Sequence, residues 1–313
     1  MGLENLVNAF SKIIVIIVTF NPDLELLRKN IISLSDKNVR VLISDNNSLA
    51  KQKLNEMCTE FSDNDLTVLY SNRNNGLAEA QNKGISYAKE NGFDYVCFFD
   101  QDTIIPNKYA NSMLDEFKIA EKKFPDKKIG MLAPNYYDYR IKEFAHFAKL
   151  TRNKYEDVKF NGEHFLEVSF VVSSGSVIKV ETINKIGLLQ EKFFIDQIDT
   201  EYSLRLLKNG YSILVTSKVL LKHTIGSRDK KRFLWLTIKP NNHSALRKYY
   251  IFRNGTRTVK DYESLFPGFK YLMFKRFVHD ILGVLLYESE KREKISAIIK
   301  GVKDGRLKIE RWK

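Results

Sequence analysis

Short apolar runs alternate with segments of helical periodicity along the first hundred residues. Residues 13–20 form a continuous, largely β-branched run, which is typical of a strand buried on both faces. Asn21-Pro22-Asp23 ends this run, and residues 24–34 then place apolar side chains at helical spacing. The same alternation continues and predicts strands at 39–44, 66–70 and 95–99, and a helix over 77–91.

This rhythm of strand and helix predicts an α/β fold with a mostly parallel sheet and helices on both faces. Polar residues follow the predicted strand ends, namely Thr19 and Asn21, then Asp45, then Asp100-Gln101-Asp102. Ligands of open α/β sheets bind at the carboxyl edge of the strands. We therefore expect these side chains to lie along one rim.

The pattern is less regular after Asp102. Residues 168–180 suggest a pair of strands around Ser173-Ser174-Gly175-Ser176, 195–207 a helix entered through an acidic turn, and 212–221 a strand. Helical periodicity dominates from residue 243. For 313 residues this favours one α/β domain over 1–242 with a helical C-terminal region over 243–313.

Composition narrows the class of protein. The 43% hydrophobic and 28% charged fractions are typical of a globular chain, and no apolar stretch approaches the roughly 20 residues that span a bilayer. No signal-type segment opens the chain, and the two cysteines, Cys58 and Cys97, belong to no paired motif. These features argue against a disulfide scaffold or zinc site and favour a reducing cytoplasm.

The formal net charge of +13 implies an anionic partner, either nucleic acid, an anionic lipid surface or a phosphorylated substrate. Much of the positive charge lies beyond residue 222. No recognisable nucleic-acid-binding module is present, and such a function would leave the acidic rim unexplained. We therefore do not expect nucleic acid as the partner.

Two acidic segments are candidates for chemistry. Asp100 and Asp102, two positions apart at a strand end, suit a divalent cation such as Mg²⁺ that also binds substrate phosphates; the alternative is a solvated turn. Asp196, Asp199 and Glu201 lie beside an apolar stretch, where mutual repulsion raises a carboxyl pKa towards the range of a general base. Their alternative is an acidic helix N-terminus favoured by the helix dipole.

Other catalytic classes find no support in the sequence. There is no Walker-type phosphate loop, no dinucleotide fingerprint around Gly76 and Gly84, and no Ser-His-Asp order or cysteine nucleophile. His223 follows a predicted strand and is either a metal or phosphate ligand or a polar surface residue. Asp45 either accepts hydrogen bonds from a base or ribose or caps a turn.

An ordered set of motifs resembles the family 2 glycosyltransferases of the GT-A fold, and their rhamnosyltransferase branch in particular. The motifs extend over nearly the whole chain: Val18-Thr19-Phe20-Asn21-Pro22, Asp45-Asn46-Asn47-Ser48, Asn72-Arg73-Asn74-Asn75-Gly76-Leu77-Ala78, Asp100-Gln101-Asp102-Thr103, Ser174-Gly175-Ser176, the segment from Phe194 to Arg205, His223-Thr224-Ile225-Gly226, Arg247-Lys248-Tyr249-Tyr250-Ile251-Phe252-Arg253-Asn254 and Gly301-Val302-Lys303-Asp304-Gly305. Each motif alone is weak, but their order is specific.

The resemblance assigns roles to individual residues. It implies a Rossmann-like sheet whose donor nucleotide is bound by Thr19, Asn21, Asp45, Asn75, Asp100 and Gln101. It implies a metal site, for Mn²⁺ or Mg²⁺, made of Asp100, Asp102 and His223, and an acceptor or sugar vicinity made of Gly175, Ser176, Asp196 and Glu201. Asp199 matches the catalytic base. Many members carry Glu directly before the base, where this chain has Ile198, so Asp196 is the alternative; Arg205 favours the alignment on Asp199.

The resemblance also implies a reaction. It is an inverting transfer of L-rhamnose from dTDP-β-L-rhamnose to a lipid-linked saccharide of a bacterial cell-wall polysaccharide or O-antigen. A UDP-sugar donor, with galactofuranose, galactose or glucose, is the alternative within the class. A glycosyltransferase-like scaffold without activity is opposed by the complete set of acidic residues and His223.

The basic C-terminal region then suggests where the enzyme works. Residues 269–287 are predicted to carry Met273, Phe274, Phe277, Val278, Ile281 and Leu285 on one side of a helix, with Lys270, Lys275 and Arg276 interspersed. Such a helix can lie in an anionic membrane interface, which would make the protein peripheral on the inner face of the cell membrane. Alternatively, the same side packs on the catalytic domain or on another subunit of a homo-oligomer.

Overall fold

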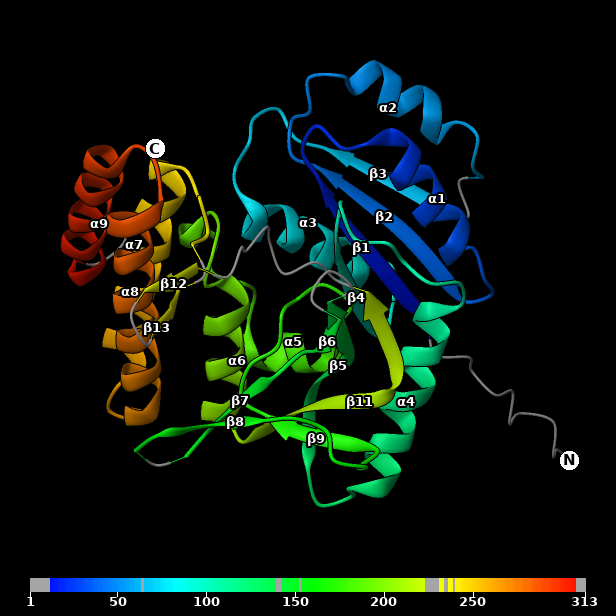
Figure 1. The fold of residues 1–313 in the computed structure, drawn as a ribbon. Coiled ribbons are helices and arrows are strands. Elements are labelled where there is room, and N and C mark those ends of the chain that lie inside the picture. Colours follow the sequence, from blue (N-terminus) through cyan, green and yellow to red (C-terminus); the bar gives the residue numbers. More distant parts are fainter. Residues whose placement is uncertain are drawn as a thin grey trace, which may run out of the picture.

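The computed structural model describes residues 12–62, 65–138, 142–151, 153–222 and 240–307, and the backbone of 231–233 and 236–238. In this part of the chain the central sheet has the strand order β3-β2-β1-β4-β10-β5-β11-β9, with β6 beside β5 (Figure 1). Its strands are β1 (Ile13–Thr19), β2 (Val39–Asp45), β3 (Leu66–Tyr70), β4 (Tyr95–Asp100), β5 (Lys128–Asp138), β6 (Glu143–Phe144), β9 (Phe165–Val168), β10 (Val177–Lys179) and β11 (Tyr211–Lys222). Two small sheets pair β7 (Phe147–Leu150) with β8 (Tyr155–Val158) and β12 (Lys231–Phe233) with β13 (Leu236–Ile238).

The prediction of a mostly parallel sheet is confirmed. β1, β2, β3 and β4 are mutually parallel, as are β5 and β11, whereas β10 runs antiparallel to both β4 and β5. Every residue of β1 is buried, as its continuous apolar run predicts for a strand covered on both faces.

Helices lie on both faces of the sheet (Figure 1). α1 (Leu24–Leu34) contacts α2 (Lys51–Cys58) and α4 (Tyr109–Lys123), while α3 (Leu77–Glu90) contacts α5 (Val180–Ile186) and the 3₁₀ turn η1 (Glu191–Phe193). α1 begins after Asn21-Pro22-Asp23 because the Asp23 carboxylate accepts hydrogen bonds from the amides of Glu25 and Leu26. The predicted elements of the first hundred residues are therefore confirmed.

The predicted strand pair over 168–180 was wrong. β9 ends at Val168 and pairs with β11, whereas β10 begins at Val177 and fits between β4 and β5. The intervening chain turns at Gly175, whose φ of +83° is accessible to glycine without strain. This turn sends β10 back through the sheet interior instead of beside β9.

The strand order creates a switch point between β1 and β4. From β1 the chain moves outward to β2 and β3, and then returns to place β4 on the other side of β1. In register, Thr19 lies beside Asp45 and Val18 lies beside Asp100. The predicted rim residues are therefore neighbours at the crevice where open α/β sheets bind their ligands.

α6 (Ile198–Lys208) precedes β11, and the C-terminal helices α7 (Ala245–Tyr262), α8 (Pro267–Tyr287) and α9 (Lys291–Arg306) pack together beside it (Figure 1). A buried charge network joins them: the Lys248 ammonium lies 2.7 Å from Asp280 and 3.1 Å from Glu288, and Lys294 lies 3.0 Å from Glu288. All four side chains are nearly inaccessible to water, so the pairing compensates their desolvation.

The predicted single apolar side of residues 269–287 divides into two in the structure. Met273 is 1% exposed and packs with Phe269, Leu272 and Leu204 of α6, whereas Phe274 is 65% exposed. Apolar side chains of α8 are buried where the helix faces the α/β domain and where it faces α7 and α9. The apolar side chains on its remaining side are exposed. One face of this helix therefore packs on the α/β part of the chain.

Both cysteines are buried and unpaired, as expected from their spacing. Across the described ranges, no helix combines the length and hydropathy needed to cross a bilayer.

Candidate functional site

The end of β1 is tied to the end of β2 by a buried carboxylate. Thr19 Oγ1 donates a hydrogen bond of 3.0 Å to Asp45 Oδ1, and Asp45 Oδ2 accepts one of 2.9 Å from the backbone N–H of Ser48. The Ser48 hydroxyl also donates to Asp45. Thr19 and Asp45 are both fully buried. Asp45 therefore orders the loop after β2.

A second set of contacts ties β1 to β4 across the switch point. Gln101 Oε1 accepts from the Phe20 N–H at 2.7 Å, and Gln101 Nε2 donates to the Phe20 carbonyl at 3.2 Å. Asn21 has φ +52°, its N–H donates to Ser48 Oγ, and its Oδ1 accepts from the Leu49 N–H. The predicted nucleotide-binding residues Thr19, Asn21, Asp45 and Gln101 thus form one connected rim.

The Asn-rich loop before α3 belongs to the same rim. Asn46 Nδ2 donates to Asn74 Oδ1 at 2.8 Å, and Asn46 Oδ1 accepts from the Asn75 N–H at 3.0 Å. Asn75 Nδ2 in turn donates to Glu79 at 2.6 Å. This network positions the backbone at the N-terminus of α3.

Asp100 and Asp102 stand at the carboxyl end of β4. Burial and the nearby charges of Asp102 and Asp199 raise the pKa of Asp100 to about 6, with Arg247 opposing the shift. Asp102 is exposed, and Ser174 Oγ accepts a 3.3 Å hydrogen bond from the Asp100 N–H. Burial is the largest cause of this shift in pKa, and the charges of the two other carboxylates add to it.

This charge and these hard oxygen donors fit a divalent cation. Among the described residues, no cluster of three or more acidic, histidine or cysteine side chains has the geometry of a metal site. The predicted third ligand, His223, lies outside the described residues.

Asp199 lies in the first turn of α6, close enough to Asp100 for their charges to interact. Burial raises its pKa, as does the charge of Asp196, whereas the Thr200 N–H, which donates to Asp199 Oδ1 at 2.7 Å, and the charge of Arg276 lower it. A carboxylate with a raised pKa is a stronger proton acceptor near neutral pH, so Asp199 has the electrostatic environment of a general base.

The two neighbouring acids have other partners. Asp196 forms a bidentate pair with Arg247 of α7, with two N···O distances of 3.1 Å. Glu201 is buried, pairs with Arg205 at 2.6 Å and accepts from the Tyr262 hydroxyl at 2.8 Å. These contacts connect Asp196 and Glu201 to α7, whereas the hydrogen bonds of Asp199 are made with its neighbour Thr200.

Gly175 and Ser176 also lie next to β4. The Gly175 N–H donates to the Phe98 carbonyl at 2.6 Å, and the Ser176 hydroxyl donates to the Val172 carbonyl at 2.6 Å. Both residues are buried, and a Cβ at Gly175 would lie 2.5 Å from the Tyr109 hydroxyl. Their predicted closeness to the sugar or acceptor stays a prediction.

The structure adds residues to the site that the sequence did not single out as site residues. Asn46, Ser48 and Ser174 hold the rim, while Arg247 and Asn254 reach it from α7. All five belong to the motifs on which the family resemblance rests. Their place in these motifs was the only sign in the sequence that they belong to the site, and the motifs did not show what these side chains contact.

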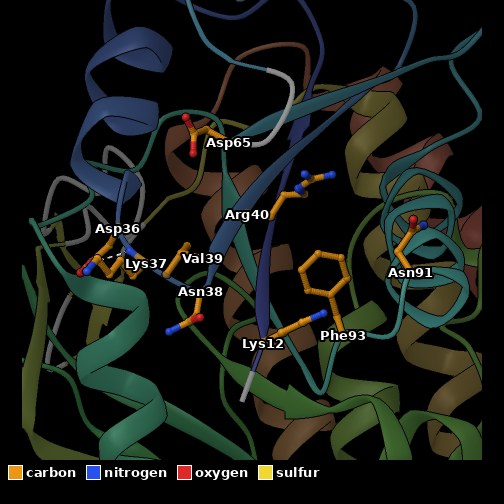
Figure 2. Close-up of a pocket in the computed structure, with 9 residues that line it drawn as sticks. All are labelled: Lys12, Asp36, Lys37, Asn38, Val39, Arg40, Asp65, Asn91 and Phe93. Carbon is orange, nitrogen blue, oxygen red and sulfur yellow. Dashed lines mark hydrogen bonds between the residues drawn. The ribbon is translucent and has the colours of Figure 1, made fainter. Parts of the chain in front are cut away.

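A recess in the described structure lies away from this rim. Its volume is about 400 Å³, and it lies at the amino ends of β1 and β2. Figure 2 shows Lys12, Arg40 and Phe93 among the residues that line it. The rim of Asp45 and Asp100 is at the opposite, carboxyl edge of these strands. The recess therefore takes no part in the candidate site.

The fold and the rim define a class of protein. Residues 14–187 match the model of "Glycosyl transferase family 2". This match covers more than half of the chain, so the chain belongs to the family 2 glycosyltransferases and is an enzyme of that class.

Individual relatives extend the likeness beyond that region. The chain is 28% identical over 305 residues to the dTDP-rhamnosyl transferase RfbF of Shigella flexneri, covering 94% of this chain and 95% of the relative. It is 30% identical over 155 residues to the glycosyltransferase GlyA of Streptococcus pneumoniae, 48% of this chain and 20% of that one.

Solved structures confirm the predicted GT-A class of fold. GalNAc-T7, solved with UDP, GalNAc and Mn²⁺, aligns with a TM-score of 0.60 and 14% identity over 96% of this chain and 56% of its own. The mannosyltransferase PcManGT of Pyrobaculum calidifontis, solved with GDP-Man and Mn²⁺, aligns with a TM-score of 0.54 and 13% identity over 94% and 73%.

Proposed function

We propose that the protein is an inverting, metal-dependent rhamnosyltransferase that transfers L-rhamnose from dTDP-β-L-rhamnose to a lipid-linked saccharide. The observation that carries this proposal is the placement of Asp45, Asp100 and Asp199 around the switch point of a family 2 sheet. Likeness to RfbF along nearly the full length of both chains supports rhamnose as the sugar.

In this proposal each part of the rim has one task. Thr19, Asn21, Asp45 and Asn75 bind the nucleoside and Gln101 braces β1 against β4. Asp100 and Asp102, with His223, hold Mn²⁺ or Mg²⁺, which supplies Lewis-acid neutralisation of the diphosphate when bound.

Asp199 accepts the proton of the acceptor hydroxyl, whose oxygen attacks the anomeric carbon on the face opposite the nucleotide. The C1–O bond to the diphosphate breaks as the new bond forms, which inverts the configuration and yields an α-L-rhamnoside. Holding both reactants in this geometry supplies much of the rate enhancement.

Calorimetry with dTDP and with UDP, with and without Mn²⁺, tests the donor assignment. We expect Mn²⁺-dependent binding that favours dTDP and is lost in Asp102→Ala. Preference for UDP would retain the mechanism and replace the donor by a UDP-sugar. Absence of binding by either nucleotide, with or without Mn²⁺, would refute the site.

We also propose that the enzyme binds the inner leaflet, where a lipid-linked acceptor is anchored, through the exposed side of α8. Tyr271, Phe274, Val278 and Leu285 are exposed at helical spacing, so they form one stripe, and basic residues accompany them. An apolar stripe with flanking cations suits an anionic membrane interface.

Flotation with vesicles of phosphatidylglycerol and phosphatidylcholine tests this arrangement. Binding should require the anionic lipid and be lost when Phe274 and Val278 are both changed to Ser. If the variant floats as the native protein does, the stripe is not the membrane contact. A dimer that dissociates in the variant would identify a second copy of the chain as the occupant.

A further inference from the structure

The turn before the predicted base has a backbone conformation that its own sequence does not favour. We call residues 193–197 the base turn. Phe194 has φ 63° and ψ −61°, and the Ile195 N–H donates to the Phe193 carbonyl at 2.7 Å, which closes a γ-turn of the strained, positive-φ kind. Asp196 and Gln197 have φ values of 65° and 63°. These conformations are sparsely populated by residues other than glycine, so contacts from outside must stabilise the base turn.

Asn254 of α7 supplies one set of these contacts. Its Nδ2 donates to the carbonyls of Phe193, Ile195 and Asp196 at 2.8, 2.8 and 3.0 Å. The side chain is fully buried, so water does not compete for these carbonyls. The two N–H groups of one side-chain amide therefore serve three carbonyls of the base turn, so one N–H is shared between two of them.

Arg253 supplies a second set. Its Nη2 donates to the carbonyls of Lys192 and Phe193 at 2.6 and 3.2 Å, and its Nε donates to Asn254 Oδ1 at 3.0 Å. The guanidinium also lies 4.7 Å from the centre of the Tyr250 ring. Arg253 thus orients the Asn254 amide and secures the start of the base turn.

The other side of the base turn touches the nucleotide rim. The Leu77 N–H donates to the Phe194 carbonyl at 2.6 Å, and a Cβ on Gly76 would lie 2.5 Å from the same oxygen. The base turn is therefore held between α7 and the N-terminus of α3, and α6, which carries Asp199 in its first turn, starts directly from it.

We infer that Asn254, oriented by Arg253, is a positioning residue that sets the location of Asp199 relative to the acceptor hydroxyl. This inference rests on the proposed role of Asp199 as base. It makes the C-terminal helices a component of the active site. A displacement of about 1 Å can cost on the order of 100-fold in rate, so loss of this support should reduce kcat strongly.

The test uses Asn254→Asp, which keeps the shape and the Arg253 contact but replaces the donor that faces three carbonyls. Arg257→Gln is the matched control: it lies one turn further along the same helix and loses an ion pair with Asp261 without touching the base turn. Turnover is followed as dTDP released from dTDP-β-L-rhamnose with Mn²⁺ and water as acceptor. Hydrogen exchange of the 193–201 amides is measured on the same proteins.

We expect Asn254→Asp to lower kcat by about 100-fold, to leave the KM for the donor within about threefold, and to speed exchange in the base turn. Arg257→Gln should change none of these by a comparable amount. Equal effects of the two variants on kcat and on exchange would overturn the inference. If Asn254→Asp does not fold, Arg253→Lys provides the same comparison, because it keeps the positive charge but lacks the planar guanidinium that donates from both Nε and Nη2.

Asp199→Asn separates this inference from the proposed function. If Asp199→Asn turns over normally, the proposed base is wrong whatever the α7 variants do. If it is inactive while Asn254→Asp resembles the control, only the positioning role fails.

Discussion

Asp100 should make the metal-free protein less stable as the pH rises. Its pKa is raised from 3.8 to about 6, so between these values the native state retains a proton that the unfolded state has released. The stability contribution is complete below pH 3.8 and is lost as the pH passes through 6. A shift of about two units corresponds to about 3 kcal/mol, of which about 2 kcal/mol falls between pH 4 and pH 7.

The comparison of native protein with Asp100→Asn isolates this contribution. Asn mimics the protonated carboxyl in shape and charge but does not titrate, and all other groups are common to both proteins. Urea unfolding in the presence of a chelator gives the free energy of unfolding at each pH. Between pH 4 and pH 7 the native protein should lose about 2 kcal/mol relative to the variant.

Mn²⁺ should reverse the difference. A cation on Asp100 favours the ionised carboxylate, so added Mn²⁺ should stabilise the native protein at pH 7 and leave Asp100→Asn nearly unchanged. Parallel pH profiles without metal would show that the negative charge around Asp100 is compensated, and the reasoning for a cation site would fail.

Two further predictions concern the support of the site. Gly76→Ala should destabilise the protein by about 2 kcal/mol or more in thermal or urea unfolding, because it adds a clash with the base turn to the strain of φ +91°; Gly92→Ala, with φ +68° and open space, should cost only about 1 kcal/mol. Lys248→Met should cost about 3–5 kcal/mol in urea unfolding, because it leaves the buried Asp280 carboxylate without its cation and Glu288 with Lys294 alone, and a loss below about 1 kcal/mol would contradict that pairing.

The sequence predicted the first half of the fold well because local signals there agree with the tertiary structure. The β-branched run that forms β1 is buried on both faces, and the residues at the strand ends lie side by side in register. In a parallel sheet the carboxyl ends share one edge, so strand order alone placed Thr19, Asp45 and Asp100 on a common rim.

The second half depends on contacts that a local pattern does not contain. β10 is three residues long, and its reversal depends on the positive φ of Gly175. The prediction also lacked α4, β5 and the β7–β8 hairpin. α4 buries side chains at helical spacing over 109–120, so a local signal for this helix was present and was missed. Asn254 meets the base turn across 58 to 61 residues of sequence, a separation at which periodicity carries no information.

The two surfaces proposed for the C-terminal helices point in different directions, and this permits a last prediction. α7 directs the buried Asn254 towards the base turn, whereas α8 exposes Phe274 and Val278. The double Ser variant of Phe274 and Val278 should therefore lose vesicle binding while retaining the native kcat for release of dTDP from the donor in water. Asn254→Asp should show the reverse, because its contacts lie wholly inside the protein. If the surface variant also lost kcat, the exposed face of α8 would be coupled to the base turn, and the helices would act as one unit instead of two.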